Sequence, residues 1–476
     1  MSFKLLLVSS PLTLEQRYGR LAWAGSTQPS FGLACLAAVA RESGVEVRIL
    51  DAAAENLSVA ASFQEVMKFE PDMVGIGSTT AGIVASGDLA ARIKNHRPHT
   101  LIVVGGCHAT ALPEETLSEF SGFDVAVIGE GEATFLEMLS SIKANGSIPD
   151  NLAGTAVRSE GKVLSNKPRE YIRILDELPL PAWSLFRNFP HAFCPSPARV
   201  KRYPCASVVL TRGCPNSCVF CDRSVFGNIC RSYSPKYAVA MFKDLRENYG
   251  VKEILVEDDT FVIVKHRVQE FCERLIAEKV DVSWSCLGRA DQVALDLLKI
   301  MRRAGCWHIS YGIESGNADI LAAMGKNLEI QQIERAVRWS KEAGLRTKGF
   351  FMVGFPGESQ ASLAETRKMV KSLPLDDISV MQVTPFPGSE LFAIADQLGT
   401  FERDWTKMTT LETVFVPHGL TRKDLETAST RLVRDFYLQP RKLLAKLTQA
   451  LLNPRLAWRL AKAFLSRTGP AQSTVP

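Results

Sequence analysis

The sequence predicts an α/β protein in which two large domains with parallel sheets are followed by a helical C-terminal region. With 476 residues, the chain is too long for one ordinary domain. Strand-like apolar segments alternate with helix-like segments about five times before residue 146 and about six times after residue 206. Polar and glycine-rich loops follow most of these strands, which is typical of domains that bind ligands at strand ends.

The proposed domain boundaries follow composition. We assign residues 1–146 to the first domain, 147–205 to a linker, 206–395 to the second domain and 396–476 to a C-terminal helical extension. The linker is rich in proline, which breaks regular structure, and glycines at 154 and 161 predict a small hairpin within it. We expect Trp183 and Phe186 to hold the linker against one of the domains.

Composition and charge are those of an ordinary soluble protein. Hydrophobic residues make up 46% of the chain and charged residues 22%. A formal net charge of +5 is weak, so no nucleic acid is expected as a partner. The N-terminus does not look like a signal peptide, and the eleven cysteines are expected to be reduced in a cytoplasmic protein. No apolar run of about 18 residues predicts a membrane span.

The first domain is predicted to be a doubly wound parallel sheet. Its expected strands are residues 3–8, 45–50, 73–77, 101–104 and 124–128, and its helices include residues 32–43, 59–69 and 84–95. Ligands of such sheets bind beyond the carboxyl ends of the strands. The candidate binding residues in those loops are Ser78, Thr79, Gly105, Gly106, His108, Thr110, Gly129 and Glu130. Because Gly-x-Gly-x-x-Gly does not follow the first strand, a dinucleotide is not expected.

The second domain is predicted to contain six strand–helix repeats. Its strands are expected at residues 208–210, 253–256, 282–286, 308–313, 348–353 and 378–383, with a helix over residues 235–249. Polar residues again gather where these strands end. The candidates are Glu257, Asp258, Arg289, Glu314, Gly354, Pro356, Gly357 and Glu358. We therefore expect a site assembled from many loops.

Cys214, Cys218 and Cys221 lie on one loop after the first strand of this domain. Three thiolates at this spacing suit an iron–sulfur cluster or zinc. A four-iron cluster normally takes four cysteines, so three leave one iron open. A structural zinc site is the alternative, but such sites pair two closely spaced ligand couples, and no second couple follows here.

These cysteines, with Phe220 before the last of them, resemble the motif of the radical S-adenosylmethionine (SAM) enzymes. The resemblance implies a [4Fe-4S] cluster whose open iron chelates SAM and whose electron cleaves it to a 5'-deoxyadenosyl radical. It also implies a partial (β/α)6 barrel of the TIM type, with an external electron donor of the flavodoxin or ferredoxin type.

Over about residues 1–395, the chain is similar to the cobalamin-binding branch of these enzymes, which implies a Rossmann-like cobalamin-binding first domain. Gly105, Gly106, His108 and Thr110, and then Gly129 with Glu130, match stretches that recur in that branch. The Asp-x-His-x-x-Gly motif of methionine-synthase-like proteins is absent. His108 is therefore either a residue that approaches cobalt or a structural histidine bonded to backbone.

The resemblance also implies roles in SAM binding. Arg289 and Glu314 are the candidates for the ribose or the amino-acid moiety. Glu257 and Asp258 are candidates for the methionine amino group, although the Gly-Gly-Glu pattern common in the superfamily is absent. The stretch with Gly354, Pro356, Gly357 and Glu358 would lie beside the adenine, and Phe220 would pack against the same part.

Three functions are consistent with these motifs and with the resemblance. The first is a cobalamin-dependent C-methyltransferase acting on an unactivated carbon of a small-molecule or lipid substrate. The second is an oxidoreductase or cyclase similar to the anaerobic magnesium-protoporphyrin ester cyclase. The third is a non-catalytic sensor, which would have no use for a SAM site.

The tail between Asp435 and Gly469 has leucines at helical spacing with Arg and Lys between them. It predicts either an amphipathic helix pair on an anionic membrane surface or, as is more usual for surface helices, a helical cap on the barrel.

Overall fold

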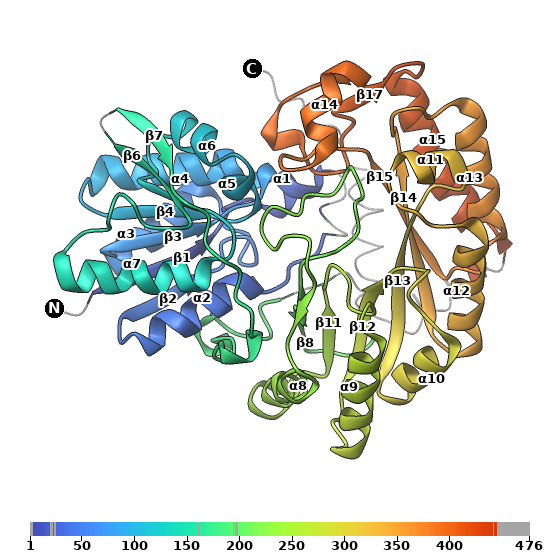
Figure 1. Ribbon diagram of the computed structural model, residues 1–476, viewed down its shortest axis with the longest axis horizontal. Helices are drawn as coiled ribbons and strands as arrows, with labels where there is room; N and C mark the ends of the chain where they lie inside the picture. The colour runs from blue at the N-terminus through green and yellow to red at the C-terminus, as the bar shows by residue number, and fades with distance from the viewer. Residues whose placement is uncertain are drawn as a thin grey trace, which may run out of the picture.

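Two parallel sheets organise the chain and form the two lobes seen in Figure 1. The computed structural model describes residues 3–19, 22, 25–159, 161–193, 195, 199–440 and 442–444. Within these residues, no helix is both long enough and apolar enough to cross a membrane.

The N-terminal sheet has seven strands in the order β2-β1-β3-β4-β5-β6-β7. The strands are β1 (Lys4–Ser9), β2 (Glu46–Leu50), β3 (Met73–Gly77), β4 (Leu101–Gly105), β5 (Val125–Val127), β6 (Thr155–Ser159) and β7 (Lys162–Ser165). β1 to β5 pair in parallel, as the sequence predicts. The linker hairpin β6–β7 joins antiparallel to β5 and so extends this sheet.

Helices cover both faces of the N-terminal sheet because alternate residues of each strand point to opposite faces. Leu5 and Leu7 pack with α2 (Phe31–Glu42) and α7 (Gly131–Asn145), whereas Leu6 and Val8 pack with α3 (Val59–Phe69), α4 (Ile83–His96) and α6 (Pro113–Glu119). Two short helices, α1 (Leu14–Tyr18) and α5 (Cys107–Ala111), form where the sequence indicates only loop and turn.

The second sheet has six parallel strands in the order β15-β14-β13-β12-β11-β8, which is the predicted partial barrel. The strands are β8 (Cys205–Val208), β11 (Glu253–Val256), β12 (Ser283–Gly288), β13 (Cys306–Glu314), β14 (Arg346–Val353) and β15 (Asp377–Gln382). The first strand lies slightly earlier than the predicted residues 208–210. The reason is that Val208 ends the pairing with β11, and the chain then turns toward the cysteine loop.

Helices surround the outer face of this barrel (Figure 1). They are α8 (Pro235–Tyr249), α9 (Lys265–Ala277), α10 (Leu295–Arg303), α11 (Ala318–Ala323), α12 (Ile330–Glu342), α13 (Gln360–Ser372) and α15 (Arg422–Tyr437). The remaining helix, α14 (Glu390–Leu398), lies at one end of the barrel and packs near the cysteine loop. In α15, Leu425, Leu432 and Phe436 recur at helical spacing and are buried in the main core, so this helix caps the barrel. The C-terminal extension also contains the short hairpin β16 (Gly399–Phe401) and β17 (Phe415–Pro417).

The linker packs between the two lobes. Trp183 is fully buried and stacks on Phe189, with ring centroids 5.2 Å apart. Phe31 of the first domain and Tyr249 of the second contact this aromatic cluster. The linker is therefore pinned by both domains rather than by one. The predicted amphipathic stretch continues beyond residue 444, and that part lies outside the described residues.

Candidate functional site

A cavity of about 360 Å³ lies at the carboxyl end of the N-terminal sheet and is open toward the second domain. Its floor contains several glycines, and its far wall is contributed by residues of the second domain. Among the predicted residues, those that line it are Ser78, Thr79, Gly105, Gly106, Gly129 and Glu130. The second domain contributes Val209, Arg212, Val225 and Phe226. The sequence-predicted ligand loops therefore do converge on one cavity.

Two glycines of this floor pack tightly against neighbouring parts of the same domain. Gly106 has φ +107°, and a Cβ there would lie 2.4 Å from the carbonyl oxygen of Ser78. A Cβ on Gly75 would lie 2.8 Å from the Leu7 side chain. Gly105 and Gly129 also line this glycine-rich cradle, and a Cβ there would meet no protein atom closer than 3.8 Å, so they leave room for a large planar ligand such as the corrin of cobalamin.

Hydroxyl groups brace the loops beneath the cavity. Ser10 Oγ donates to Ser78 Oγ at 3.0 Å, and Ser86 Oγ lies 3.2 Å from the same atom. Thr110 does not line the cavity. Its Oγ1 accepts a hydrogen bond from the Gly129 amide at 3.1 Å and so ties two glycine loops together. The predicted Ser78 and Thr110 are therefore supports of the loop geometry.

His108 does not line the cavity, although the sequence analysis places it among the cofactor candidates. It is 1% exposed and packs edge-on against Trp405, with ring centroids 5.0 Å apart. Burial lowers the pKa of His108 to about 4. Its Nδ1 has no hydrogen-bond partner among the described residues, and its role toward the cofactor stays a prediction.

The cysteine loop begins at a two-residue strand, β9 (Thr211–Arg212), and returns through β10 (Arg231–Ser232), which pairs antiparallel with it. Cys218 is 9% exposed, Cys214 is partly exposed and Cys221 is exposed. Asn216 Nδ2 donates to the Cys214 sulfur at 3.0 Å, and Arg289 Nη1 lies 3.9 Å from the Cys218 sulfur. Donors of this kind stabilise thiolates, which are the form that binds iron.

The three cysteines are free and share one loop, so they fit a cluster held by three thiolates. Burial raises the pKa of Cys218, and the cations Lys326 and Arg289 oppose that rise. Across the described part of the chain, no three Cys, His, Asp or Glu side chains are gathered tightly enough for a single metal ion.

Arg289 and Glu314 lie beside the cysteine loop and share a neighbour, Lys326. Arg289 Nη2 donates to the Lys326 carbonyl at 2.7 Å, and Lys326 Nζ lies 2.7 Å from Glu314 Oε1. Arg289 also forms an ion pair with Asp291 at 3.1 Å. Glu314 has φ +67° at a register shift of β13, which aims its side chain along the barrel end. The structure therefore brings both predicted residues to the cysteine loop.

Glu358 closes the loop that contains Gly354, Pro356 and Gly357. Its Oε2 accepts hydrogen bonds from the amides of Gly354 at 2.6 Å and Phe355 at 3.3 Å, while Oε1 is buried with no partner among the described residues. Burial raises the pKa of Glu358 to about 7, against the opposing effect of these two amides. Gly354 and Gly357 have φ of +98° and +86°, which favour glycine.

Phe220 packs in a separate apolar cluster that includes Ile320, Met352 and Phe355. Lys326 Nζ lies 6.0 Å from the centre of its ring. Phe220 is therefore next to the loop that Glu358 closes, as the sequence analysis expects.

Glu257 and Asp258 have protein partners in the structure. Glu257 Oε1 lies 2.7 Å from Arg199 Nη2 and accepts from Gln28 Nε2 at 3.3 Å. Asp258 is 2% exposed, and its Oδ1 accepts from the Leu210 amide at 2.6 Å. Burial raises the pKa of Asp258 to about 7. Asp258 thus holds the strand that leads into the cysteine loop, and its role toward SAM stays a prediction.

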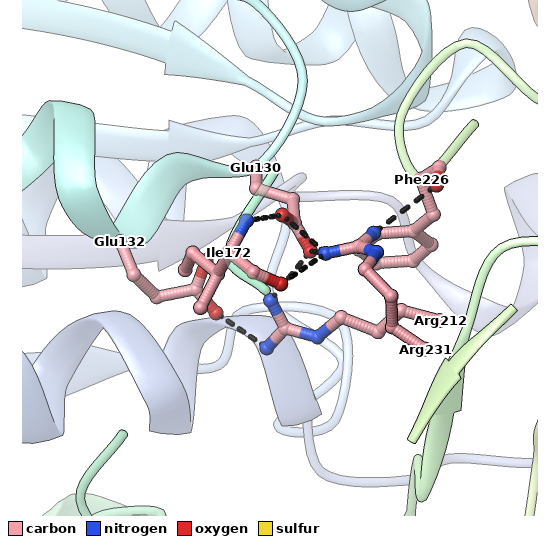
Figure 2. A network of polar contacts seen from close by, with 6 residues as sticks. All are labelled: Glu130, Glu132, Ile172, Arg212, Phe226 and Arg231. Carbon is pink, nitrogen blue, oxygen red and sulfur yellow. Dashed lines mark hydrogen bonds and ion pairs between the residues drawn. The ribbon is translucent and has the colours of Figure 1, made fainter. Parts of the chain in front are cut away.

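Sequence reasoning missed the charged residues that join the two domains. Arg212 and Arg231 flank the cysteine loop and form ion pairs with Glu130 and Glu132. Figure 2 shows these contacts. The sequence features that could have pointed to these contacts were an arginine two residues before the first cysteine and the repeated glutamates at 130 and 132. No sequence pattern pointed to Lys326, the partner of Glu314.

Two family models match the chain. The B12 binding domain matches residues 19–139, and the radical SAM superfamily matches residues 208–370. The first range contains the glycine-rich cradle, and the second contains the cysteine loop with Arg289, Glu314 and Glu358. This assigns cobalamin to the cradle domain, and a [4Fe-4S] cluster with SAM to the barrel. The zinc alternative for the cysteine loop is therefore not supported.

Relatives extend over nearly the whole chain. An uncharacterised methyltransferase of Pyrococcus horikoshii is 34% identical over 93% of this chain and 94% of its own length. The anaerobic magnesium-protoporphyrin IX monomethyl ester cyclase of Rubrivivax gelatinosus is 28% identical over 93% of this chain and 79% of its own length.

Among solved structures, the radical SAM methyltransferase TsrM from Kitasatospora setae, with cobalamin and a [4Fe-4S] cluster bound, has the same fold. It matches with a TM-score of 0.68 and 15% identity over 93% of this chain and 83% of its own. Together with the geometry of the two sites, these similarities show that the chain belongs to the cobalamin-binding radical SAM enzymes.

Proposed function

We propose that this enzyme is a C-methyltransferase that acts on an unactivated carbon. The observation that carries the proposal is the shared cavity, whose floor is the cobalamin-domain cradle and whose opposite wall belongs to the cysteine-loop segment. Methyl transfer through cobalamin requires the two cofactors to face a common space. The similarity to the Pyrococcus methyltransferase over almost the full length of both chains supports the same reading.

When bound, the cluster supplies the electron that cleaves SAM, and cobalamin supplies a carrier for the methyl group. The residues of the chain bind and orient these cofactors. Gly105, Gly106 and Gly129 let backbone groups approach the corrin, and Cys214, Cys218 and Cys221 hold the cluster. Arg289 and the Glu314–Lys326 pair, which lie near the cysteine loop, are proposed to bind the zwitterionic methionine moiety of SAM.

The substrate is proposed only by class, as a small molecule or a lipid with an unactivated carbon. An external one-electron donor of the flavodoxin or ferredoxin type is part of the proposal, because the cluster needs a reductant. Peripheral membrane contact through the tail beyond residue 444 is a further proposal, motivated by the leucine, arginine and lysine pattern there.

An oxidative cyclase is the second candidate, favoured by the similarity to the Rubrivivax cyclase. The chain spans 79% of that relative and 94% of the Pyrococcus methyltransferase, and this difference favours methyl transfer. A non-catalytic sensor is disfavoured, because the cysteine loop, Arg289, Glu314 and the Glu358 loop are the residues proposed to bind SAM, and a sensor does not need a SAM site.

The test is an anaerobic reaction of cluster-loaded protein with SAM, cobalamin, reductant and candidate substrates, followed by mass spectrometry. S-adenosylhomocysteine formed together with 5'-deoxyadenosine supports methyl transfer, and SAM with a deuterated methyl group must label the product. Consumption of substrate with 5'-deoxyadenosine alone supports the cyclase instead. Binding of both cofactors without SAM cleavage under any reductant supports the sensor. The Cys218→Ala variant, which lacks one cluster ligand, is the matched control.

A further inference from the structure

Four charged side chains join the cobalamin domain to the base of the cysteine loop (Figure 2). Arg212 Nη1 donates to Glu130 Oε1 at 3.0 Å, and its Nη2 donates to Glu132 Oε1 at 2.6 Å. Arg231 Nη1 donates to both oxygens of Glu130 at 2.9 and 2.8 Å. The glutamates begin α7 of the first domain, and the arginines come from β9 and β10 of the second.

The side chains of this network are almost fully buried. The side chains of Arg212 and Glu130 are each 4% exposed, that of Glu132 is 8% exposed and that of Arg231 is 10% exposed. Two positive and two negative charges balance, and Glu130 Oε2 also accepts from the Ile172 amide at 2.9 Å. Buried charges are held firmly in such an arrangement because each one depends on its partners. Loss of one partner would therefore leave another buried charge uncompensated.

One side of the network reaches the cobalamin cavity. Glu130, Glu132 and Arg212 line that cavity, as does Phe226. The guanidinium carbon of Arg212 lies 5.5 Å from the centre of the Phe226 ring. Arg231 Nη2 donates to the Phe226 carbonyl at 3.1 Å. A ligand in the cavity therefore contacts side chains whose positions the two arginines determine.

The other side of the network reaches the cluster cysteines. Phe226 lies five residues after Cys221. The next residue, Gly227, accepts a hydrogen bond from the Cys214 amide at 3.2 Å. The loop has no slack at this point, because a Cβ on Gly213 would lie 2.4 Å from the Ile229 carbonyl oxygen and 2.7 Å from that of Phe226. A displacement of Phe226 is therefore transmitted to Cys214.

We propose that Glu130 and Arg212 are positioning residues that couple cobalamin binding to the conformation of the cluster loop. Cobalamin against Phe226 and the Glu130 backbone fixes the loop that holds Cys214, and a loaded cluster fixes the wall against which cobalamin binds. Coupling of this kind is reciprocal, so each cofactor raises the affinity for the other by the same factor. The proposed coupling depends only on the assignment of the two cofactors to their domains, and not on which reaction the enzyme catalyses.

The first test titrates hydroxocobalamin into cluster-free and cluster-loaded protein and follows its visible spectrum, with no SAM or substrate present. We expect cluster loading to tighten cobalamin binding in the wild type by a factor in the range of about 5 to 150, which is usual for coupled sites. In Glu130→Gln the factor should fall toward about 1, since the arginines lose their shared charged partner. Asp281→Asn removes partly exposed ion pairs with Arg202 and Arg246, which lie outside both sites, and should keep the wild-type factor.

The second test is hydrogen exchange of residues 211–231 with and without hydroxocobalamin. In the wild type, cobalamin should slow exchange in this segment, and in Glu130→Gln the slowing should be lost. Phe226→Leu changes no charge and leaves the ion pairs intact, but it should also reduce the coupling factor. This variant therefore tests the proposal if Glu130→Gln does not fold. The proposal would be overturned if Glu130→Gln and Phe226→Leu kept the wild-type coupling factor, or if the wild type showed no coupling.

Discussion

Glu314 and Lys326 form an ion pair at 2.7 Å in which both side chains are 8% exposed. Removing one partner of a buried pair leaves an uncompensated charge, which typically costs about 3–5 kcal/mol. Lys326→Met is therefore expected to lower the free energy of unfolding by about that amount, measured by chemical denaturation of the cluster-free protein. It should also weaken SAM binding, because Glu314, a candidate for SAM binding, loses its charged partner.

Two variants control this prediction. The double variant Lys326→Met with Glu314→Gln removes both charges and should recover most of the lost stability. Lys299→Met breaks the exposed pair with Glu342, whose side chains are 49% and 56% exposed, and should change stability far less. If Lys326→Met is no more destabilising than Lys299→Met, the buried pair is not important for stability.

A second prediction concerns Glu358, whose pKa burial raises to about 7 from an ordinary value of 4.5. The folded protein therefore binds this proton more tightly than the unfolded chain does. Stability should fall as the pH rises from about 4.5 to about 7 and then level off. Glu358→Gln removes this titration, so its stability relative to the wild type should increase by roughly 3 kcal/mol across that range.

Denaturation curves at several pH values test this expectation on the cluster-free protein. The comparison between variant and wild type cancels other titrating groups, including Asp258, whose pKa burial also raises to about 7. Glu426→Gln, at an exposed position of α15, controls for the substitution itself. A stability difference that is independent of pH would show that Glu358 stays ionised in the folded protein.

A third prediction uses two glycines with positive φ. Gly106 has φ +107° and a Cβ there would lie 2.4 Å from the Ser78 carbonyl oxygen, whereas Gly250 has φ +66° and open space around it. Gly250→Ala should cost about 1–2 kcal/mol of stability from backbone strain alone. Gly106→Ala should cost more and should also abolish hydroxocobalamin binding, because Ser78 lines the same cavity. Cobalamin binding to Gly106→Ala with wild-type affinity would contradict the assignment of the cradle.

The order of elements could be predicted from the sequence because strand and helix periodicities are strong in both sheets. The six strands of the barrel and α8 over residues 235–249 lie close to their predicted positions. The loops at strand ends could be identified for the same reason, since Gly105, Gly106 and Glu130 directly follow strands and line one cavity.

Contacts between distant parts of the chain could not be predicted in this way. The local sequence pattern carries no information on which distant element of the fold a side chain contacts. It could not place His108 against Trp405, nearly 300 positions later in the chain. Nor could it pair Arg212 with Glu130, or show that the linker hairpin joins the first sheet through β5.

The last prediction concerns the contact between the C-terminal extension and the cobalamin domain. Trp405 covers His108 with its ring centroid 5.0 Å away, and its Nε1 donates to Glu119 Oε2 at 3.1 Å. Burial lowers the pKa of His108 to about 4. In Trp405→Ala, water should reach the imidazole, and this pKa should rise by about 1–2 units toward its ordinary value.

Histidine ring signals followed by NMR over a pH titration measure this change, and His108→Gln assigns the signal. Trp405→Phe keeps an aromatic cover and should leave the pKa low, which separates loss of the ring from loss of the hydrogen bond to Glu119. Since the low pKa results from desolvation, an unchanged value in Trp405→Ala would mean that the first domain buries His108 by itself. In that case the extension would not be what shields this edge of the cobalamin domain.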